Sequence, residues 1–342
     1  MRVICSKRIR HGMLVLAAVL FFTPAISNDN SPNKNVLCII SYSADYQWAN
    51  DILNGLRRNL QLSDLAAAIE LFELNVSTQP DARPRTGDIA RLQTRLDSYH
   101  YDSIVVLSNP ALELFLQGKL KTPDQTPIVF SSYWESPRMK RAGYLPNMTG
   151  ITMPLTNRMN IQLGMKLFPT LREIVVLTNP AADGQAVAEQ LESYRADISF
   201  PGELTILNGS AISTEKLLTY LKRLPADSLI LYNDWFTSDD GPKLSRSTLQ
   251  EKLLENTPHV PLLINTDSIP LQRQFAIGGV MVSGEKLGAR TGELLQQVLR
   301  GASPSSLPVR EMETEQRFDH RKLQAFGISS SRLPSGSVVL NR

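Results

Sequence analysis

The run Val36-Leu37-Cys38-Ile39-Ile40, followed at once by Ser41-Tyr42-Ser43, decides the fold of this chain. Five consecutive apolar residues that end in small polar ones are typical of a β-strand buried on both faces. Short apolar runs of this kind recur along the 342 residues and alternate with amphipathic stretches of helical period, the first of which spans about residues 48–60. This alternation predicts an α/β protein with parallel sheets flanked by helices.

The pattern of strands and helices occurs twice, which predicts two Rossmann-like lobes joined by a hinge. Expected strands are Val36–Ser41, Ile69–Leu74, Ser103–Leu107 and Pro127–Ser131, then Glu173–Leu177, Leu204–Leu207, Ser228–Tyr232 and Pro261–Ile264, with a further one at Val309–Phe318. The Pro- and Gly-containing stretch Leu145–Pro154 marks a crossing between lobes. We therefore expect an N-terminal lobe over 28–150, a C-terminal lobe over 151–282, and over 283–342 a helix and a return segment that crosses back toward the N-terminal lobe.

The first 27 residues have the features of a secretory signal peptide. Four basic residues precede the apolar run Met13–Phe22, and Ala25 and Ser27 provide the small residues of a cleavage site before Asn28. A retained membrane anchor is the alternative, but the apolar run is shorter than the about 20 residues that a membrane span needs. The mature protein is therefore expected to be periplasmic.

The charge balance argues against nucleic-acid binding. The chain has 36 Lys and Arg against 33 Asp and Glu, and residues 1–27 hold four of the basic residues and none of the acidic ones, so the remainder has 32 against 33. The slight basicity belongs to the targeting segment, and no dense Lys/Arg run follows it.

Motifs of metal, cofactor and nucleophilic chemistry are missing from the sequence. It contains no phosphate-binding loop, no H-E-x-x-H, no G-x-S-x-G and no C-x-x-C. Once residues 1–27 are removed, Cys38 is the one cysteine left, within an apolar run typical of a buried thiol. We expect no cofactor, no metal and no enzyme activity; a hydrolase that uses Asp234 with a second carboxylate is the alternative.

Polar and aromatic residues directly follow most of the expected strands. Ligands of open α/β sheets bind beyond the carboxyl ends of the strands, so these residues are the candidates for contact with a small molecule. The candidate ligand-binding residues are Ser41, Tyr42, Ser108, Asn109, Ser132, Tyr133, Asn179, Asn233, Asp234, Trp235 and Asp267. Turn formation and helix capping would explain the Ser, Asn and Asp residues equally well, whereas packing in the seam between lobes is the alternative for the aromatic ones.

Several of these segments together resemble the ABC-transporter substrate-binding protein family, which has the type I periplasmic binding fold and also forms the extracytoplasmic sensor domain of bacterial histidine kinases. The similar segments are Val36–Ser43 with Trp48, Leu145–Ile151, Gly278-Gly279, Leu299-Arg300-Gly301, Leu307-Pro308-Val309 and the tail from Phe326 to Asn341. The chain departs from the family in lacking a His before Ser41-Tyr42.

The resemblance implies a two-lobed receptor that closes over a small organic molecule by a hinge motion and then meets a membrane partner. An amino-acid-like or aromatic ligand is the first expectation. The partner is expected to be an ABC permease; a membrane histidine kinase or cyclase, for which this chain would be a ligand-sensing accessory protein, is the alternative. The sequence stops at Arg342 without a kinase, so signalling would use a separate protein. A scaffold that binds no small molecule is a third possibility.

Overall fold

The computed structural model describes residues 34–43, 46–76, 84–135, 143–193, 195–237, 246–269 and 274–342. All of them belong to one compact unit, Asn33–Arg342. The signal peptide expected over residues 1–27 lies outside the described residues. Within these residues, no helix is both long enough and apolar enough to cross a membrane.

The first lobe is built on a six-stranded, fully parallel sheet in the order β11-β5-β4-β3-β1-β2. Its strands are β1 (Lys34–Ile40), β2 (Ala67–Glu73), β3 (Ser103–Leu107), β4 (Ile128–Tyr133), β5 (Met148–Thr152) and β11 (Arg310–Glu311), and its helices are α1 (Gln47–Gln61), α2 (Thr86–Ser98), α3 (Asn109–Leu116) and α9 (Gly284–Leu299). Alternate residues of β1 point to opposite faces. Val36, Cys38 and Ile40 pack with α1 and α9, whereas Leu37 and Ile39 pack with α2 and α3.

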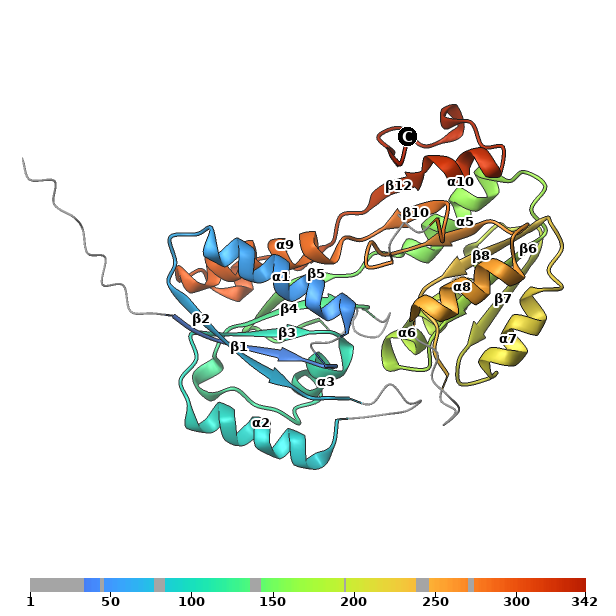
Figure 1. The fold of residues 1–342 in the computed structure, drawn as a ribbon. Coiled ribbons are helices and arrows are strands. Elements are labelled where there is room, and N and C mark those ends of the chain that lie inside the picture. Colours follow the sequence, from blue (N-terminus) through green and yellow to red (C-terminus); the bar gives the residue numbers. More distant parts are fainter. Residues whose placement is uncertain are drawn as a thin grey trace, which may run out of the picture. The chain divides into compact units, whose positions relative to one another are not determined.

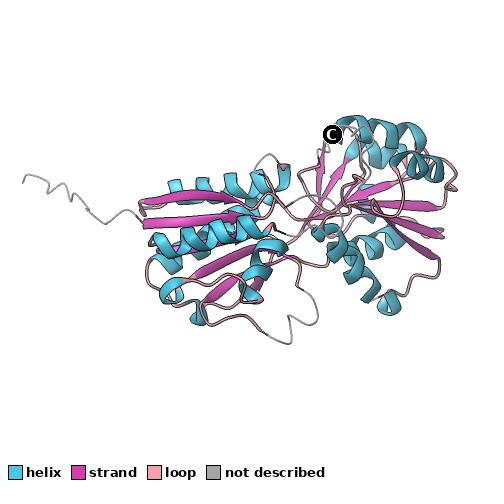
Figure 2. Ribbon diagram, turned by 90° about the horizontal axis from the view of Figure 1, so that it is seen from below, coloured by secondary structure: helices cyan, strands magenta, loops and turns pink. Residues whose placement is uncertain are grey.

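The second lobe has a seven-stranded sheet in the order β13-β12-β10-β9-β8-β6-β7, parallel except where β10 pairs with β12. Its strands are β6 (Glu173–Thr178), β7 (Glu203–Asn208), β8 (Ser228–Tyr232), β9 (Leu262–Ile264), β10 (Gly278–Met281), β12 (Glu315–Asp319) and β13 (Val338–Leu340), and its helices are α5 (Thr156–Leu167), α6 (Ala182–Ser193), α7 (Thr214–Leu221), α8 (Arg246–Asn256) and α10 (His320–Ala325). One face of the sheet is covered by α7 and α8 and the other by α5, α6 and α10. Helices therefore cover both faces of each sheet (Figure 2), which confirms the predicted fold class.

Four short 3₁₀ turns complete the secondary structure of the described residues. They are η1 (Pro123–Gln125), η2 (Arg195–Asp197), η4 (Pro304–Ser306) and η5 (Ser330–Arg332). None of them contributes to the cavity described below.

Helix α9 follows a strand of the second sheet but packs against the first lobe, alongside α1 (Figure 1). Glycines allow the two helix backbones to approach closely: a Cβ at Gly288 would lie 2.0 Å from the carbonyl oxygen of Ile52, and one at Gly55 would lie 1.9 Å from that of Glu285. Gln296 Nε2 also donates to Asn59 Oδ1 across the helix pair, at 2.7 Å.

The segment expected to form one strand over Val309–Phe318 forms two strands in different sheets. β11 pairs with β5 of the first sheet, and β12 pairs with β10 and β13 of the second. Residues 312–314 connect them. Similarly, the stretch expected only as a crossing contains β5, so the chain leaves the first sheet after Thr152 and not at residue 150.

Candidate functional site

A cavity of roughly 680 Å³, counting space open to solvent, is lined by residues of both lobes. Most of these residues follow a strand end: Trp134 follows β4, Asn179 follows β6, Asp234 lies beyond β8 and Thr266 beyond β9. This is the position at which open α/β sheets bind ligands, because connecting loops converge at the carboxyl ends of parallel strands.

The first lobe contributes mainly aromatic rings, from Tyr46, Trp48 and Trp134, which we call the ring wall. Buried polar side chains bind the two tryptophans, Trp48 through its indole and Trp134 through its backbone. Trp48 Nε1 donates to Ser132 Oγ at 2.8 Å, so the indole N–H is bound within the first lobe. The Asn109 amide binds the Trp134 backbone twice: Nδ2 donates to the carbonyl oxygen at 3.0 Å, and Oδ1 accepts from the backbone N–H at 2.9 Å.

The second lobe contributes amides, hydroxyls and one carboxylate, which we call the polar wall. Its members are Thr156, Thr178, Asn179, Asn233, Asp234, Asn265, Thr266 and Ser268. The amides are organised by local hydrogen bonds: Asn265 Nδ2 donates to Asn233 Oδ1, and Asn179 Oδ1 accepts from the Ala181 backbone N–H at 3.0 Å. The polar wall thus presents fixed hydrogen-bonding groups to a molecule in the cavity.

Asp234 is the one acidic residue among the described residues that line the cavity. It is buried, and its backbone lies in the left-handed region with φ of 91°. Its Oδ1 accepts hydrogen bonds from the Tyr232 hydroxyl at 3.2 Å and from the Trp235 backbone N–H at 3.0 Å. A buried carboxylate on a sparsely populated backbone conformation points to a functional constraint at this position.

The loop after β9 connects the polar wall to the first lobe. Ser268 Oγ donates to Asp51 Oδ2 of α1 at 2.6 Å, and Asp267 Oδ1 accepts from the Gly284 backbone N–H at 3.1 Å. Burial raises the pKa of Asp267, and the nearby charge of Asp51 acts in the same direction. Arg317 Nη1 lies 3.8 Å from Asp267 Oδ2 and opposes that rise.

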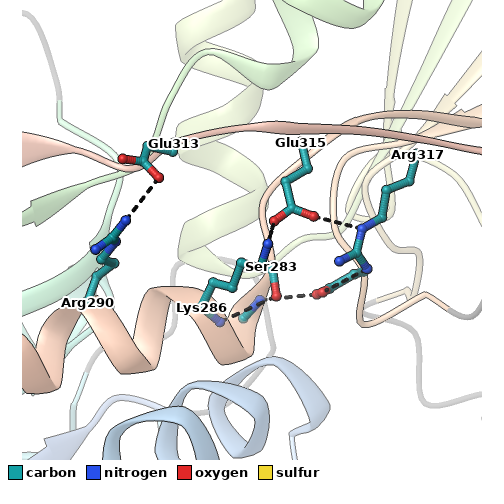
Figure 3. A network of polar contacts seen from close by, with 8 residues as sticks. Ser283, Lys286, Arg290, Glu313, Glu315 and Arg317 are labelled. Carbon is teal, nitrogen blue, oxygen red and sulfur yellow. Dashed lines mark hydrogen bonds and ion pairs between the residues drawn. The ribbon is translucent and has the colours of Figure 1, made fainter. Parts of the chain in front are cut away.

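Ion pairs are formed within residues 312–314 and directly after them, where the chain returns to the second sheet (Figure 3). Before β12, Glu313 lies 3.4 Å from Arg290 of α9. Within β12, Glu315 pairs with Lys286 of α9 and accepts from Arg317 Nε at 2.7 Å. The start of α9 is therefore connected by charged side chains to the strand that follows the crossing.

Of the residues predicted from the sequence, Asn179, Asn233 and Asp234 line the cavity together. Tyr42 lines a neighbouring cavity of roughly 560 Å³, which shares Tyr46 and Asn179 with the first.

The remaining predicted residues lie behind the cavity walls. Ser132 and Asn109 hold the tryptophans of the ring wall. Ser41 Oγ donates to the Leu107 carbonyl oxygen at 2.9 Å and accepts from the Ala111 N–H at 3.0 Å, so it connects β1, β3 and α3. Ser108 is buried at the N-terminus of α3 with φ of 72°.

The other two aromatic side chains chosen from the sequence, Tyr133 and Trp235, pack in the lobe cores. Tyr133 lies edge-on to Phe130 in the first lobe. Trp235 is buried in the second lobe, where its Nε1 donates to Thr214 Oγ1 at 3.3 Å. The predicted Asp267 lies beside the cavity, in the loop contacts described above.

The strand-end segments selected from the sequence border the cavity, but several of its lining residues were not selected. Trp134 lines the cavity instead of its neighbour Tyr133, because β4 contains an irregularity between Phe130 and Tyr133, with Ser132 at φ of 56°. Tyr46 and Trp48 were missed because they stand at the start of α1 and not directly after a strand. The aromatic pair flanking a helix start was the available signal.

Within the described ranges, no group of three or more His, Cys, Asp or Glu residues that could hold a metal ion occurs.

Comparison of the sequence with protein-family models and with curated proteins gives no match. Solved structures do match. An ABC domain from Streptococcus pneumoniae in complex with L-Trp superposes with a TM-score of 0.64 at 18% identity, covering 90% of this chain and 100% of that one. A ligand-free, open substrate-binding protein with adhesive properties from Clostridium difficile gives 0.58 at 17% identity, covering 90% and 99%.

A LacI transcriptional regulator from Lactobacillus brevis also matches, with a TM-score of 0.55 at 14% identity, covering 82% of this chain and 97% of that one. At such identities the likeness shows the fold and not the function. The described chain therefore has the two-lobed α/β fold of type I periplasmic binding proteins, as predicted from the sequence.

Proposed function

We propose that this protein is an exported, periplasmic solute-binding protein that captures a small organic molecule in the cavity between its lobes. One observation carries the proposal: a single cavity has a ring wall from one lobe and a polar wall from the other. A molecule that contacts both walls binds more strongly when the lobes hold it together than when only one wall touches it. Ligand binding then favours the closed arrangement by this difference in affinity.

Delivery of the solute to an ABC permease is the role we propose for the closed form. The family resemblance of the sequence supports this role, as do the matching structures of an ABC domain with L-Trp and of a substrate-binding protein. The same binding event would serve a membrane histidine kinase or cyclase if this protein is a sensing accessory. Co-purification with detergent-solubilised membranes of the source cells, with and without ligand, distinguishes the two partners.

Export is supported by the sequence of residues 1–27 alone. N-terminal sequencing of the protein from the periplasmic fraction tests it, with a mature terminus at Asn28 as the expected result. A protein that stays in the cytoplasm with Met1 intact would contradict the localisation.

Ligand binding is tested by thermal unfolding in the presence of amino acids, amines, nucleosides, sugars and organic acids. A ligand at a hundredfold excess over its Kd adds about 2.7 kcal/mol to the stability of the folded state, which is a readily measured shift. Trp134→Ala should weaken binding of any solute found in this way. Tyr99→Ala, at an aromatic residue that is 54% exposed and outside the cavity, is the control. Absence of any shift across the whole library would overturn the proposal.

A further inference from the structure

Among the described residues, the pairing of β9 with β10 is interrupted next to the cavity. Leu263 pairs with Gly278. Pairing resumes at the bridge between Thr266 and Val282, which is three residues further along one segment (263 to 266) and four along the other (278 to 282). The extra residue on the side of β10 makes this a β-bulge, an irregularity that disrupts the backbone ladder and is common next to functional sites.

The side-chain amide of Asn160, on α5, lies in this interruption. Its Oδ1 accepts from the Val280 backbone N–H at 2.7 Å, and its Nδ2 donates to the Val280 carbonyl oxygen at 2.9 Å. Nδ2 also donates to the carbonyl oxygen of Ile264, at 3.4 Å. Because a backbone N–H can only donate, the contact with Val280 fixes which way the amide is turned. One amide therefore binds both strands between the two points at which they pair.

The amide is buried and closely packed. Asn160 is 1% exposed. A Cβ at Gly279 would lie 2.9 Å from Asn160 Oδ1 and 2.3 Å from the carbonyl oxygen of Ile264, so the backbone of β10 lies directly against both. Without the amide, the buried backbone groups of Val280 and Ile264 would lose these hydrogen bonds, and this loss favours a shift of the two segments against each other.

The segment beyond the interruption belongs to the polar wall. Asn265 and Thr266 come directly after β9 and line the cavity. The Val282 N–H donates to the carbonyl oxygen of Asn265 at 3.0 Å, which binds this segment to the one that follows β10. A shift of β9 against β10 would therefore move Asn265 and Thr266, and groups that bind a ligand must be held to within about 0.5 Å of their working positions.

We propose that Asn160 is a positioning residue for solute binding: its amide holds the bulge between β9 and β10 and thereby fixes Asn265 and Thr266 at the cavity. This step rests on the proposed function. Asn160 is not among the described residues that line the cavity, so it acts through those that do.

Exchange of side-chain amides with solvent tests the arrangement in the parent protein. In the NMR spectrum of the mature protein, the Asn160 side-chain NH2 should exchange at least about tenfold more slowly than that of Asn54, because one net hydrogen bond contributes about this factor. Asn54 is exposed on α1 and provides the reference. Equal exchange of the two side chains would overturn the proposal.

Asn160→Leu keeps a side chain of similar size and removes all three hydrogen bonds. Backbone exchange of residues 264–268, taken relative to that of β6, should rise by at least about tenfold. Leu221→Ala, at a leucine buried on α7 of the same lobe, is the matched control for a general loss of stability and should not raise this ratio. If Asn160→Leu does not fold, Asn160→Asp, which keeps an acceptor for the Val280 N–H, gives the same comparison.

Affinity tests the link from this segment to solute binding. The probes are L-tryptophan and the other members of the solute library, of which those that stabilise the parent protein are measured by isothermal titration. Asn160→Leu should weaken their binding by at least about tenfold, because a small misplacement of binding groups has effects of this size. Leu221→Ala should leave their binding nearly unchanged.

The outcomes separate this inference from the proposed function. Equal changes in the exchange of residues 264–268 in Asn160→Leu and Leu221→Ala would overturn the positioning role and leave solute binding intact. Faster exchange of this segment without a loss of affinity would overturn it too. Failure of every solute to bind the parent protein would contradict the proposed function itself, whereas the exchange measurements would still show whether Asn160 holds this segment.

Discussion

The two lobes share one architecture but contribute different chemistry to the cavity between them. The first lobe provides rings held from behind by buried side chains, as Ser132 holds Trp48. The second provides amides and a carboxylate on loops directly beyond its strand ends. Under the proposed function, this difference divides recognition between the lobes: the first provides apolar contact area, and the second provides selectivity through polar groups that must be satisfied.

The largest loss of stability is expected at the contact between α1 and α9. Helix α9 follows β10 of the second sheet in sequence but packs on the first lobe. Gly288→Ala should destabilise the protein by about 2–3 kcal/mol, because the added Cβ meets the backbone of α1 and overpacks the α1–α9 contact. Urea unfolding measures the change. Gly87→Ala is the control, since nothing lies within 4 Å of a Cβ there, and it should change stability by less than about 1 kcal/mol. Equal effects of the two substitutions would show that α9 is not tightly bound to α1.

The second-largest loss of stability is expected at Asn109, behind the ring wall, and it is compared with the loss at Asn265 on the polar wall. Asn109→Ala removes two hydrogen bonds to the Trp134 backbone and leaves partly buried groups unsatisfied, so it should cost about 2 kcal/mol in free energy of unfolding. Asn265→Ala removes one hydrogen bond to Asn233 at the cavity surface and should cost less than about 1 kcal/mol. A larger cost for Asn265→Ala would reverse the assignment of support to the first lobe and recognition to the second.

The fold could be predicted from the sequence because strands of a parallel sheet that are buried on both faces consist of continuous apolar runs. Every strand expected from such a run, from Val36–Ser41 to Pro261–Ile264, overlaps an observed strand. β5 was missed as a strand because its Pro- and Gly-rich surroundings are typical of a loop. The division of residues 309–318 between two sheets depends on tertiary pairing, which local periodicity does not report.

The cavity was predictable to the level of segments but not of single residues. Strand-end polarity selected Asn179, Asn233 and Asp234, and these three residues line one cavity. Strand alternation fails at β4, where the irregularity at Ser132 turns Tyr133 into the core and leaves Trp134 at the cavity. Such a positive φ at a serine follows from its tertiary contacts, one of which is the hydrogen bond from Trp48.

One carboxyl from each lobe, Glu70 and Asp267, should respond to pH with opposite sign. In the first lobe, the hydrogen bond from Arg95 lowers the pKa of Glu70, so its contribution to stability is present above the unfolded pKa of about 4.3 and is lost as the pH falls through the folded value. In the second lobe, burial raises the pKa of Asp267. The folded state then holds this proton more tightly than the unfolded state, and stability falls as the pH rises from about 3.9 toward the folded pKa.

Unfolding free energies of Glu70→Gln and Asp267→Asn, measured from pH 3 to pH 7 against the parent protein, test this contrast. Glu70→Gln should flatten the acid arm of the stability curve. Asp267→Asn should gain stability relative to the parent as the pH rises. Parallel curves for both variants would mean that neither carboxyl titrates differently in the folded and unfolded states.

The smallest effect is expected at the contact between the walls. Ser268→Ala removes the hydrogen bond from Ser268 Oγ to Asp51 of α1 and should cost about 1 kcal/mol in free energy of unfolding, the usual net value of one such bond. Ser210→Ala, at an exposed serine in the loop after β7, provides the control. Because Ser268 lies on the polar wall while Asp51 belongs to the lobe of the ring wall, the same substitution should also weaken solute binding by a few fold. Loss of stability without loss of binding would mean that this bond supports the fold but does not help the two walls hold a ligand together.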